Sequence, residues 1–141
     1  MLLFHRKNRG PAGIRSDAER DRATAQVQFL RAALDKLGSS SAAARCEQML
    51  ETRHAEIRDY EALKRGEIQL PPVARLDEIG ALIPRIRISR GLTQTELARR
   101  LGVSKQVVSR YEETGYRTAG MARLQEILDA IGVKTSIRLE V

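Results

Sequence analysis

Four polar side chains in the last third of the chain are suited to bind another molecule. Lys105, Gln106, Ser109 and Arg110 fall on the outer face of a helix that the sequence pattern predicts there. Their ammonium, amide, hydroxyl and guanidinium groups all donate hydrogen bonds. Residues 84–117 around them contain eight basic and three acidic residues, while the whole chain has a net charge of +7. This concentration of positive charge favours a polyanion as partner, although a solvated basic surface has the same composition.

Two short helices must hold these side chains in place. Thr93 and Glu96 have the spacing of a capping box, which predicts the start of the first helix. Gly102 suits the left-handed position at which that helix ends. Ser104 then caps the second helix, whose outer face carries the polar residues. The apolar positions of both helices face inward: Leu97, Ala98, Leu101, Val103, either Val107 or Val108, and Tyr111.

This arrangement resembles the helix-turn-helix of the Cro/phage-repressor (XRE) family. That motif has a small residue where Ala98 stands, glycine where Gly102 stands and an aliphatic residue where Val108 stands. The resemblance covers residues 79–132, the usual five-helix unit, with the fifth helix shortened or replaced. Pro84 is a departure within the first helix, where it predicts a kink or a restart. The motif core consists of Leu97, Ala98, Leu101, Gly102, Val103, Val108 and Tyr111.

The resemblance implies a role for each exposed position of the motif. The second helix of the pair enters the major groove of double-stranded DNA, and the residues that face base edges are Ser104, Lys105, Gln106, Ser109 and Arg110. Lys and Arg can donate to guanine, and Gln can pair with adenine. The residues placed to contact phosphate are Arg90, Thr93, Gln94, Tyr116 and Arg117. Gln94 would do so through its N–H at a helix N-terminus, which favours an anion. Arg87 and Glu112 stand where some members form a structural ion pair, and are left out of the DNA contacts.

The whole chain divides into five predicted segments. They are a flexible basic arm (1–15), a helical hairpin for oligomerisation or partner binding (16–66), a linker (67–74), the helix-turn-helix domain (75–132) and a C-terminal strand (133–141). The arm contains four basic and no acidic residues. A pair of prolines in the linker favours an extended chain. The predicted fold class is therefore mainly α, with one strand.

The hairpin is predicted from its caps and its apolar spacing. Ser16 and Glu19 form a second capping box, Gly38 ends the first helix, and the second helix covers residues 41–65. Helices joined by so short a turn lie antiparallel. They could bury their stripes against each other, against the rest of the chain or against a second copy. The stripes are Ala23, Val27, Leu30, Leu34 and Leu37 in the first helix, and Cys46, Met49, Leu50, Ile57, Tyr60 and Leu63 in the second.

The chain ends in a segment of alternating character. A last helix, capped by Thr118 and ended by Gly132, precedes it. In residues 133–141 apolar and polar side chains then alternate, which predicts a half-buried strand. A lone strand needs a partner for its backbone groups. The same strand of a second copy is the simplest partner, which predicts a homodimer, and another extended segment of the chain is the alternative.

No constellation of catalytic residues is present in the sequence. The only histidines are His5 and His54, no zinc-protease motif or glycine-rich phosphate loop occurs, and Cys46 lies on an apolar helix face. We therefore expect no enzyme activity, no cofactor and no metal. A single cysteine fits a reducing cytoplasm. No apolar run reaches the roughly 18 residues that span a bilayer, so no membrane partner is expected.

The expected function is sequence-specific binding of double-stranded DNA. In this interpretation a homodimer acts at a palindromic operator as a transcriptional regulator, most simply a repressor. The alternative is an antitoxin that binds a toxin protein through residues 16–66 and regulates its own operon. A third possibility is a helix-turn-helix that has lost DNA binding and serves as a scaffold.

Overall fold

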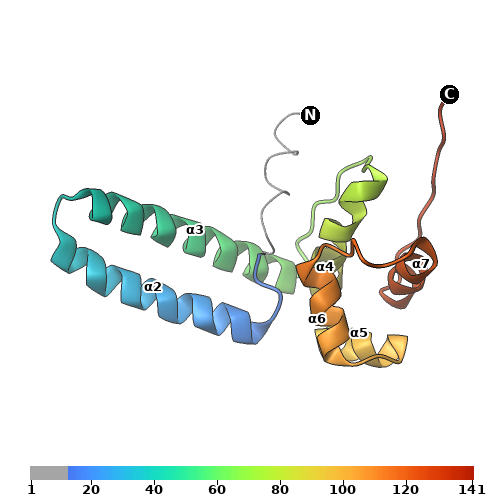
Figure 1. Cartoon of the computed structure of the whole chain (residues 1–141), viewed down its shortest axis with the longest axis horizontal. Coiled ribbons are helices and arrows are strands. Elements are labelled where there is room, and N and C mark those ends of the chain that lie inside the picture. Colours follow the sequence, from blue (N-terminus) through green and yellow to red (C-terminus); the bar gives the residue numbers. More distant parts are fainter. Residues whose placement is uncertain (1–12) are drawn as a thin grey trace.

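The computed structural model describes residues 13–141, which form six α-helices in two groups (Figure 1). The first group is an antiparallel hairpin of α2 (Asp17–Leu37) and α3 (Ser41–Lys64), which extends to the left in Figure 1. The second group follows a short 3-10 turn, η1 (Leu76–Glu78), and consists of α4 (Ile79–Ser89), α5 (Gln94–Leu101), α6 (Lys105–Glu113) and α7 (Met121–Ala130). The predicted mainly α class is confirmed for the described residues. Most of the predicted arm lies outside them.

The hairpin is closed by a narrow seam of small side chains. Ala23 and Val27 of α2 are buried, as are Ala43 and Cys46 of α3. The thiol of Cys46 also donates a weak hydrogen bond to the carbonyl oxygen of Leu30, at 3.3 Å. Because the distance between two packed helices depends on the side chains at their contact, small residues let α2 and α3 approach closely.

Some apolar positions of the predicted stripes nevertheless face solvent. Met49 is 51% exposed, and Leu37 at the end of α2 is also exposed. The reason is that a single partner helix covers only one side of α3. Residues at the margin of a stripe therefore stay in water, even where the spacing is regular.

The start of α2 follows its predicted cap in part. Ser16 accepts a hydrogen bond from the N–H of Glu19, and Gly38 follows the helix with φ 57°. The reciprocal half of the capping box is not formed, because the Glu19 carboxylate accepts the N–H of Arg15 instead, at 2.8 Å. Arg15 is thereby tied to the first turn of α2, and the predicted flexible arm does not include it.

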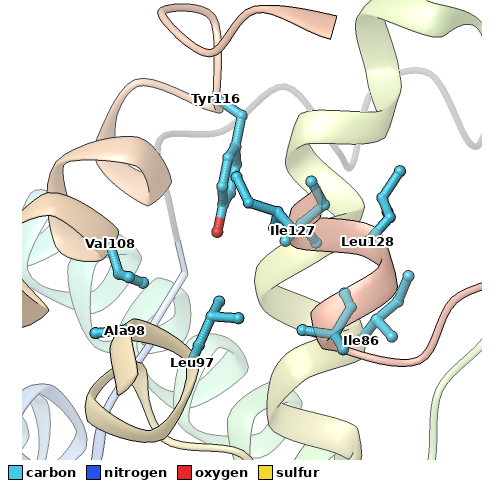
Figure 2. Packing of buried hydrophobic residues seen from close by; sticks show 9 residues of the cluster. Ile86, Leu97, Ala98, Val108, Tyr116, Ile127 and Leu128 are labelled. Atoms are coloured by element: carbon cyan, nitrogen blue, oxygen red, sulfur yellow. The ribbon is translucent and has the colours of Figure 1, made fainter. Parts of the chain in front are cut away.

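The four short helices of the second group share one apolar core (Figure 2). Ile83, Leu97, Val108 and Ile127 come one from each helix, and all four side chains are fully buried. Helices of 8 to 11 residues are marginal on their own. Packing around this shared core therefore stabilises them. The other members of the cluster are Ile86, Ala98, Tyr116, Leu128 and Ile131.

Pro84 lies inside α4 without dividing the helix. The helix runs unbroken over residues 79–89, so the predicted restart is wrong. Proline removes one backbone donor and crowds the preceding turn. Ile83 and Ile86, on either side of it, are both buried in the core. This packing holds the helix together across the missing hydrogen bond.

α4 is also the surface on which the hairpin rests. Tyr60 and Leu63 of α3 are buried against Ile88 of α4. The Tyr60 hydroxyl donates to the carboxylate of Asp17 at 2.9 Å, which joins α3 to the start of α2. Burial, first of all, raises the pKa of Tyr60 above its ordinary value, so this hydroxyl stays a donor. The two groups of helices therefore meet at a partly apolar contact on α4.

α4 makes its closest approach to the rest of the domain at Gly80. A Cβ at this position would collide with the carbonyl oxygen of Gly115, in the turn that follows α6. That turn contains two consecutive left-handed residues, Gly115 with φ 61° and Tyr116 with φ 60°. Only glycine at position 80 lets the two backbones come together in this way.

The end of the chain differs from its prediction. α7 begins at Met121 after an N-cap at Gly120, so the predicted cap at Thr118 is wrong. Residues 133–141 have no regular structure, and the part of the chain that the structure describes contains no strand. The predicted C-terminal strand is therefore wrong for the single chain. The physical reason is that a strand exists only where its backbone groups find a partner, and no extended segment in this part of the chain pairs with it.

Candidate nucleic-acid interface

The geometry of α5 and α6 is set by their caps. The hydroxyl of Thr93 accepts the N–H of Glu96 at 3.1 Å, and the carboxylate of Glu96 accepts the N–H of Thr93 at 2.7 Å, so the predicted capping box is confirmed. These hydrogen bonds, first of all the one from the Thr93 backbone, hold the pKa of Glu96 below its ordinary value. Gly102 ends α5 in the left-handed conformation, with φ 66°. Ser104 then accepts the N–H of Val107 at 3.4 Å, which starts α6.

The inner sides of α5 and α6 lie where the motif places them. Leu97, Ala98 and Val108 are buried in the core, and α5 packs on α6 at this point. Val107 is only partly buried, so Val108 is the inner one of the two valines. The remaining motif positions are partly buried at the edge of the same core: Leu101, Val103 and Tyr111.

The outer face of α6 presents its hydrogen-bond donors to solvent. Ser104, Lys105, Gln106 and Arg110 are exposed, and Ser109 is partly exposed. Among the described residues, neither Lys105 nor Arg110 has an ion-pair partner. Both cations are thus available to an outside acceptor. The contact of these five residues with base edges stays a prediction.

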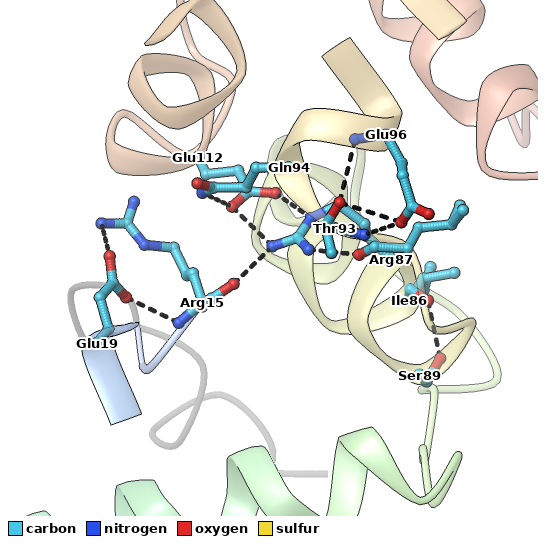
Figure 3. A network of polar contacts seen from close by, with 10 residues as sticks. Arg15, Glu19, Ile86, Arg87, Ser89, Thr93, Gln94, Glu96 and Glu112 are labelled. Carbon is cyan, nitrogen blue, oxygen red and sulfur yellow. Dashed lines mark hydrogen bonds and ion pairs between the residues drawn. The ribbon is translucent and has the colours of Figure 1, made fainter. Parts of the chain in front are cut away.

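A buried ion pair joins α6 to α4 (Figure 3). The side chains of Arg87 and Glu112 are 2% and 0% exposed. Arg87 donates from Nε to one carboxylate oxygen of Glu112 at 2.6 Å and from Nη2 to the other at 3.1 Å. Burying charge is costly unless the partners are paired and hydrogen-bonded, and this bidentate geometry meets both conditions. The pair is the one that the family resemblance implies.

The same ion pair is hydrogen-bonded to three further places in the chain. Gln94 of α5 donates from its amide to Glu112 at 2.7 Å. Arg87 donates to the carbonyl oxygen of Leu92 at 2.7 Å and to that of Arg15 at 3.0 Å. Helices α4, α5 and α6 and the segment entering α2 therefore meet at one guanidinium and one carboxylate. The outward face of α6 is oriented by these contacts of its inward face.

Gln94 can fill its predicted phosphate role only through the backbone. Its side chain is buried and bonded to Glu112, as described above. Its N–H belongs to the first turn of α5, where backbone donors lack partners within the helix. Thr93 beside it is exposed, although its hydroxyl lies within hydrogen-bonding distance of Glu96. A phosphate at this end of α5 would thus meet backbone groups first.

Arg90 caps a helix instead of reaching freely into solvent. Its Nη1 donates to the carbonyl oxygens of Ile131 and Gly132, each at 2.8 Å, and Arg100 donates to that of Ala130 at 2.6 Å. These carbonyls end α7, where the helix dipole favours positive charge. The predicted phosphate contact of Arg90 would have to compete with this cap. Sequence reasoning missed the cap because the arginines and the helix end lie far apart in the chain.

Tyr116 cannot contact phosphate, so that prediction is wrong. Its side chain lies in the core (Figure 2), and the residue is 4% exposed. Its ring stacks on that of Tyr111, with 5.6 Å between the ring centroids. Burial, the largest cause, raises the pKa of Tyr116 above its ordinary value. The left-handed backbone at this residue turns the ring inward. The sequence does not reveal this orientation, because the tyrosine stands in a turn with polar neighbours. Arg117, next to it, is exposed and stays a candidate for phosphate contact.

Arg15 is a residue that sequence reasoning placed in the arm. Besides offering its carbonyl oxygen to Arg87, it lies with its guanidinium 3.4 Å from Glu19 and 4.0 Å from Glu113 at the end of α6. Its side chain is only 12% exposed. No local signal could have shown this, because Arg15 and Arg87 are 72 residues apart in the chain.

The described residues lack the features of a metal site and of a membrane span. Within residues 13–141, no three His, Cys, Asp or Glu side chains gather closely enough to hold a metal ion. No helix of that part of the chain has both the length and the apolar character needed to cross a membrane. Cys46 is a free and buried thiol, as its position on an apolar face predicts.

Residues 85–137 match the protein family described as Helix-turn-helix. The matched segment includes the capping box of α5, the left-handed Gly102, the buried pair of Arg87 and Glu112, and the exposed donors of α6. No curated protein and no solved structure matches the chain.

Proposed function

We propose that this chain, which carries a DNA-binding helix-turn-helix domain of the Cro/phage-repressor (XRE) type, is a sequence-specific regulator of transcription in the cytoplasm, most simply a repressor. The observation that carries the proposal is the contrast between the two sides of α6. Its inward side is held by a buried ion pair, while its outward side presents exposed donors that have no ion-pair partner within residues 13–141. A recognition helix needs both properties, because direct readout requires donors held in a defined position in the major groove. No catalytic activity, metal or cofactor is part of this proposal.

Selection from random duplex DNA, followed by gel-shift measurements at two salt concentrations, tests the proposal. We expect an enriched palindrome and an affinity that falls steeply as salt rises, because phosphate contacts release counterions. An absence of any enriched sequence, together with salt-insensitive binding, would refute it.

Alanine variants of α6 test which residues read the sequence. Lys105→Ala, Gln106→Ala and Arg110→Ala should each weaken binding to the selected site by about 1–3 kcal/mol and change binding to random DNA little. Arg58→Ala is the matched control, because it removes an exposed charge from another helix, α3. Equal losses on both DNAs would make the three residues phosphate contacts.

The proposal includes a homodimer, whose two recognition helices would enter successive major grooves about 34 Å apart. Support comes from the tail 133–141, where Ile137, Leu139 and Val141 are exposed apolar residues that alternate with polar ones. Contact between the tails of two copies would remove these side chains from water. Analytical ultracentrifugation should show that Ile137→Asp with Leu139→Asp dissociates the dimer, whereas Ser136→Asp, on the alternate side, leaves it intact. A dimer that persists in the double variant would exclude the tail as the interface.

A second candidate function is that of an antitoxin whose hairpin binds a toxin protein. It is favoured by one observation, the exposure of Phe29 and of neighbouring residues on one side of α2. Co-expression with the product of the neighbouring gene tests it. If the pair forms a complex that contains the hairpin, and the neighbouring product alone arrests growth, this function is supported.

A further inference from the structure

The hairpin has a second stripe besides its buried seam. Beginning just before α2, the positions Arg15, Glu19, Arg22, Gln26 and Phe29 follow one another at alternating steps of four and three. The last four lie within α2, where this spacing places them along one side. Together with residues of α3 they line an open groove of about 700 Å³ along the hairpin.

One end of this groove carries an exposed aromatic side chain. Phe29, which lines the groove there, is 73% exposed. A phenylalanine side chain offers one of the largest apolar contact surfaces of any residue, and an occupant would remove it from water. The groove is open along its length, so it suits a macromolecular surface better than an enclosed small molecule.

Among the described residues that line the groove, the charged side chain without an ion-pair partner is a cation. Both of its carboxylates are already paired, Glu19 with Arg15 at 3.4 Å and Glu56 with Arg53 at 2.5 Å. Arg22 is exposed and has no ion-pair partner among the described residues. An occupant that matches the groove must therefore supply acceptors. Carboxylates are the natural choice, because they pair with guanidinium groups in bidentate geometry.

We propose that the groove binds an amphipathic α-helix of a partner protein, with an apolar stripe flanked by carboxylates. From position 19 to position 29 the stripe is about 15 Å long, which corresponds to about three turns of such a helix. Two antiparallel helices leave a groove in which a third can pack, and steps of three and four suit the interlocking of side chains. A DNA backbone would satisfy the arginines but would leave Phe29 in water. The proposal rests on the protein-binding function of the hairpin and is independent of DNA binding.

Two designed peptides test this surface on the full chain. Both form an amphipathic helix with leucines at steps of three and four, and they differ only in having glutamates or lysines beside the leucines. Fluorescence anisotropy should show binding of the glutamate peptide and at least about tenfold weaker binding of the lysine peptide. If neither peptide binds, or if both bind equally, the proposal is overturned.

Substitutions in the groove locate the binding. Arg22→Glu should weaken binding of the glutamate peptide at least about tenfold and strengthen that of the lysine peptide. Phe29→Ala should weaken both. Because both side chains lie on the surface of α2, the variants should keep the wild-type helix content and melting curve. Arg58→Glu on α3 is the matched control, since it reverses an exposed charge that does not line the groove. Equal loss in this control would overturn the proposal.

Other occupants give distinct results, and each would overturn the proposal. Dissociation of a dimer by Phe29→Asp would place a second copy in the groove. Loss of affinity for a random duplex in Arg22→Glu would make the groove part of the DNA surface. Tighter peptide binding after substitution of Leu2, Leu3 and Phe4 by Asp would make the N-terminal residues of this chain the occupant.

A variant of α6 separates this proposal from the DNA-binding function. The chain with Lys105, Gln106 and Arg110 all changed to Ala should bind the glutamate peptide with unchanged affinity. Loss of peptide binding in that variant would contradict the independence of the two surfaces. Failure of the wild-type chain to bind a specific DNA would leave the peptide result as it stands.

Discussion

The two groups of helices in this molecule are stabilised in different ways. The domain of α4 to α7 uses helices of 8 to 11 residues, and each contributes fully buried Ile, Leu or Val side chains to one core. The hairpin uses helices of 21 and 24 residues that meet along a seam of small side chains. In the domain, the capping box of α5, the left-handed Gly102 and the buried pair of Arg87 and Glu112 fix where the helices lie. In the hairpin the ion pairs, such as that of Arg20 with Glu61, are partly exposed to water.

This difference in stabilisation fits the two proposed functions, which are reading DNA and binding a protein. Direct readout of DNA needs side chains that are held in one position, and the buried contacts of the domain hold α6 in this way. A surface that accepts another helix needs length and regular spacing instead, and two long antiparallel helices provide both. The comparison predicts that single changes in the domain cost much more stability than matched changes at the hairpin contact.

The largest effect is expected from the buried ion pair. Arg87→Met keeps an apolar stem but leaves the Glu112 carboxylate buried with Gln94 as its remaining side-chain partner. Leaving a buried charge unpaired should lower the free energy of unfolding by about 3–5 kcal/mol, measured by urea denaturation.

The matched change on the same helix is Arg85→Met, at the hairpin contact. Arg85 pairs with Asp59 of α3, but both side chains are partly exposed. A pair in contact with water contributes about 1 kcal/mol or less, so the loss should be small. If the two variants lose equal stability, the contrast between the two regions is wrong.

The next effect concerns the close approach of α4 to the turn after α6. Gly80→Ala places a methyl group against the backbone of Gly115, and the helices must move apart to accept it. We expect a loss of about 2–3 kcal/mol in the free energy of unfolding, with weaker DNA binding because α6 shifts. Gly120→Ala is the control, since a Cβ there meets open space. A stable Gly80→Ala variant with normal DNA affinity would contradict this reading of the turn.

The smallest effect is expected at the base of the hairpin. Hydrogen bonds from Tyr60 and then Lys64 hold the pKa of Asp17 below its ordinary value of 3.8. A carboxylate with a lowered pKa stabilises the fold above its ordinary pKa, and this contribution is lost as pH falls through the folded-state value. Because Asp17 is largely exposed, Asp17→Asn should cost about 0.5 kcal/mol at neutral pH. Thermal denaturation at several pH values checks this: a difference that does not shrink in acid would exclude the carboxylate as its source.

The parts that sequence predicted well depend on short-range signals. Thr93 and Glu96 lie three residues apart, and the capping box they form needs nothing beyond their own turn. The left-handed Gly102 is equally local, because the demand for glycine arises from the backbone itself. The capping box predicted at Ser16 formed only in part. Ser16 accepts the N–H of Glu19, but the Glu19 carboxylate accepts the N–H of Arg15 and not that of Ser16.

The parts that sequence predicted poorly depend on partners far along the chain. Tyr116 was expected at the surface, yet the backbone turn after α6 directs its ring into the core. Arg90 was expected to meet phosphate, yet the end of α7 lies within reach of its guanidinium. Residues 133–141 have the alternation of a strand, but alternation does not supply a neighbour to pair with.

The sequence by itself determined the local architecture of this protein: where the helices of the motif begin and end, which of their sides is apolar, and which donors face outward. These properties follow from caps, spacing and backbone preference within a few residues. The tertiary structure alone decided how the inward side of α6 is held, because Arg87, Glu112, Gln94 and the carbonyl of Arg15 meet only after four segments have packed together. It also decided which side of the hairpin stays uncovered, since the apolar pattern of a helix does not say how many neighbours will pack against it.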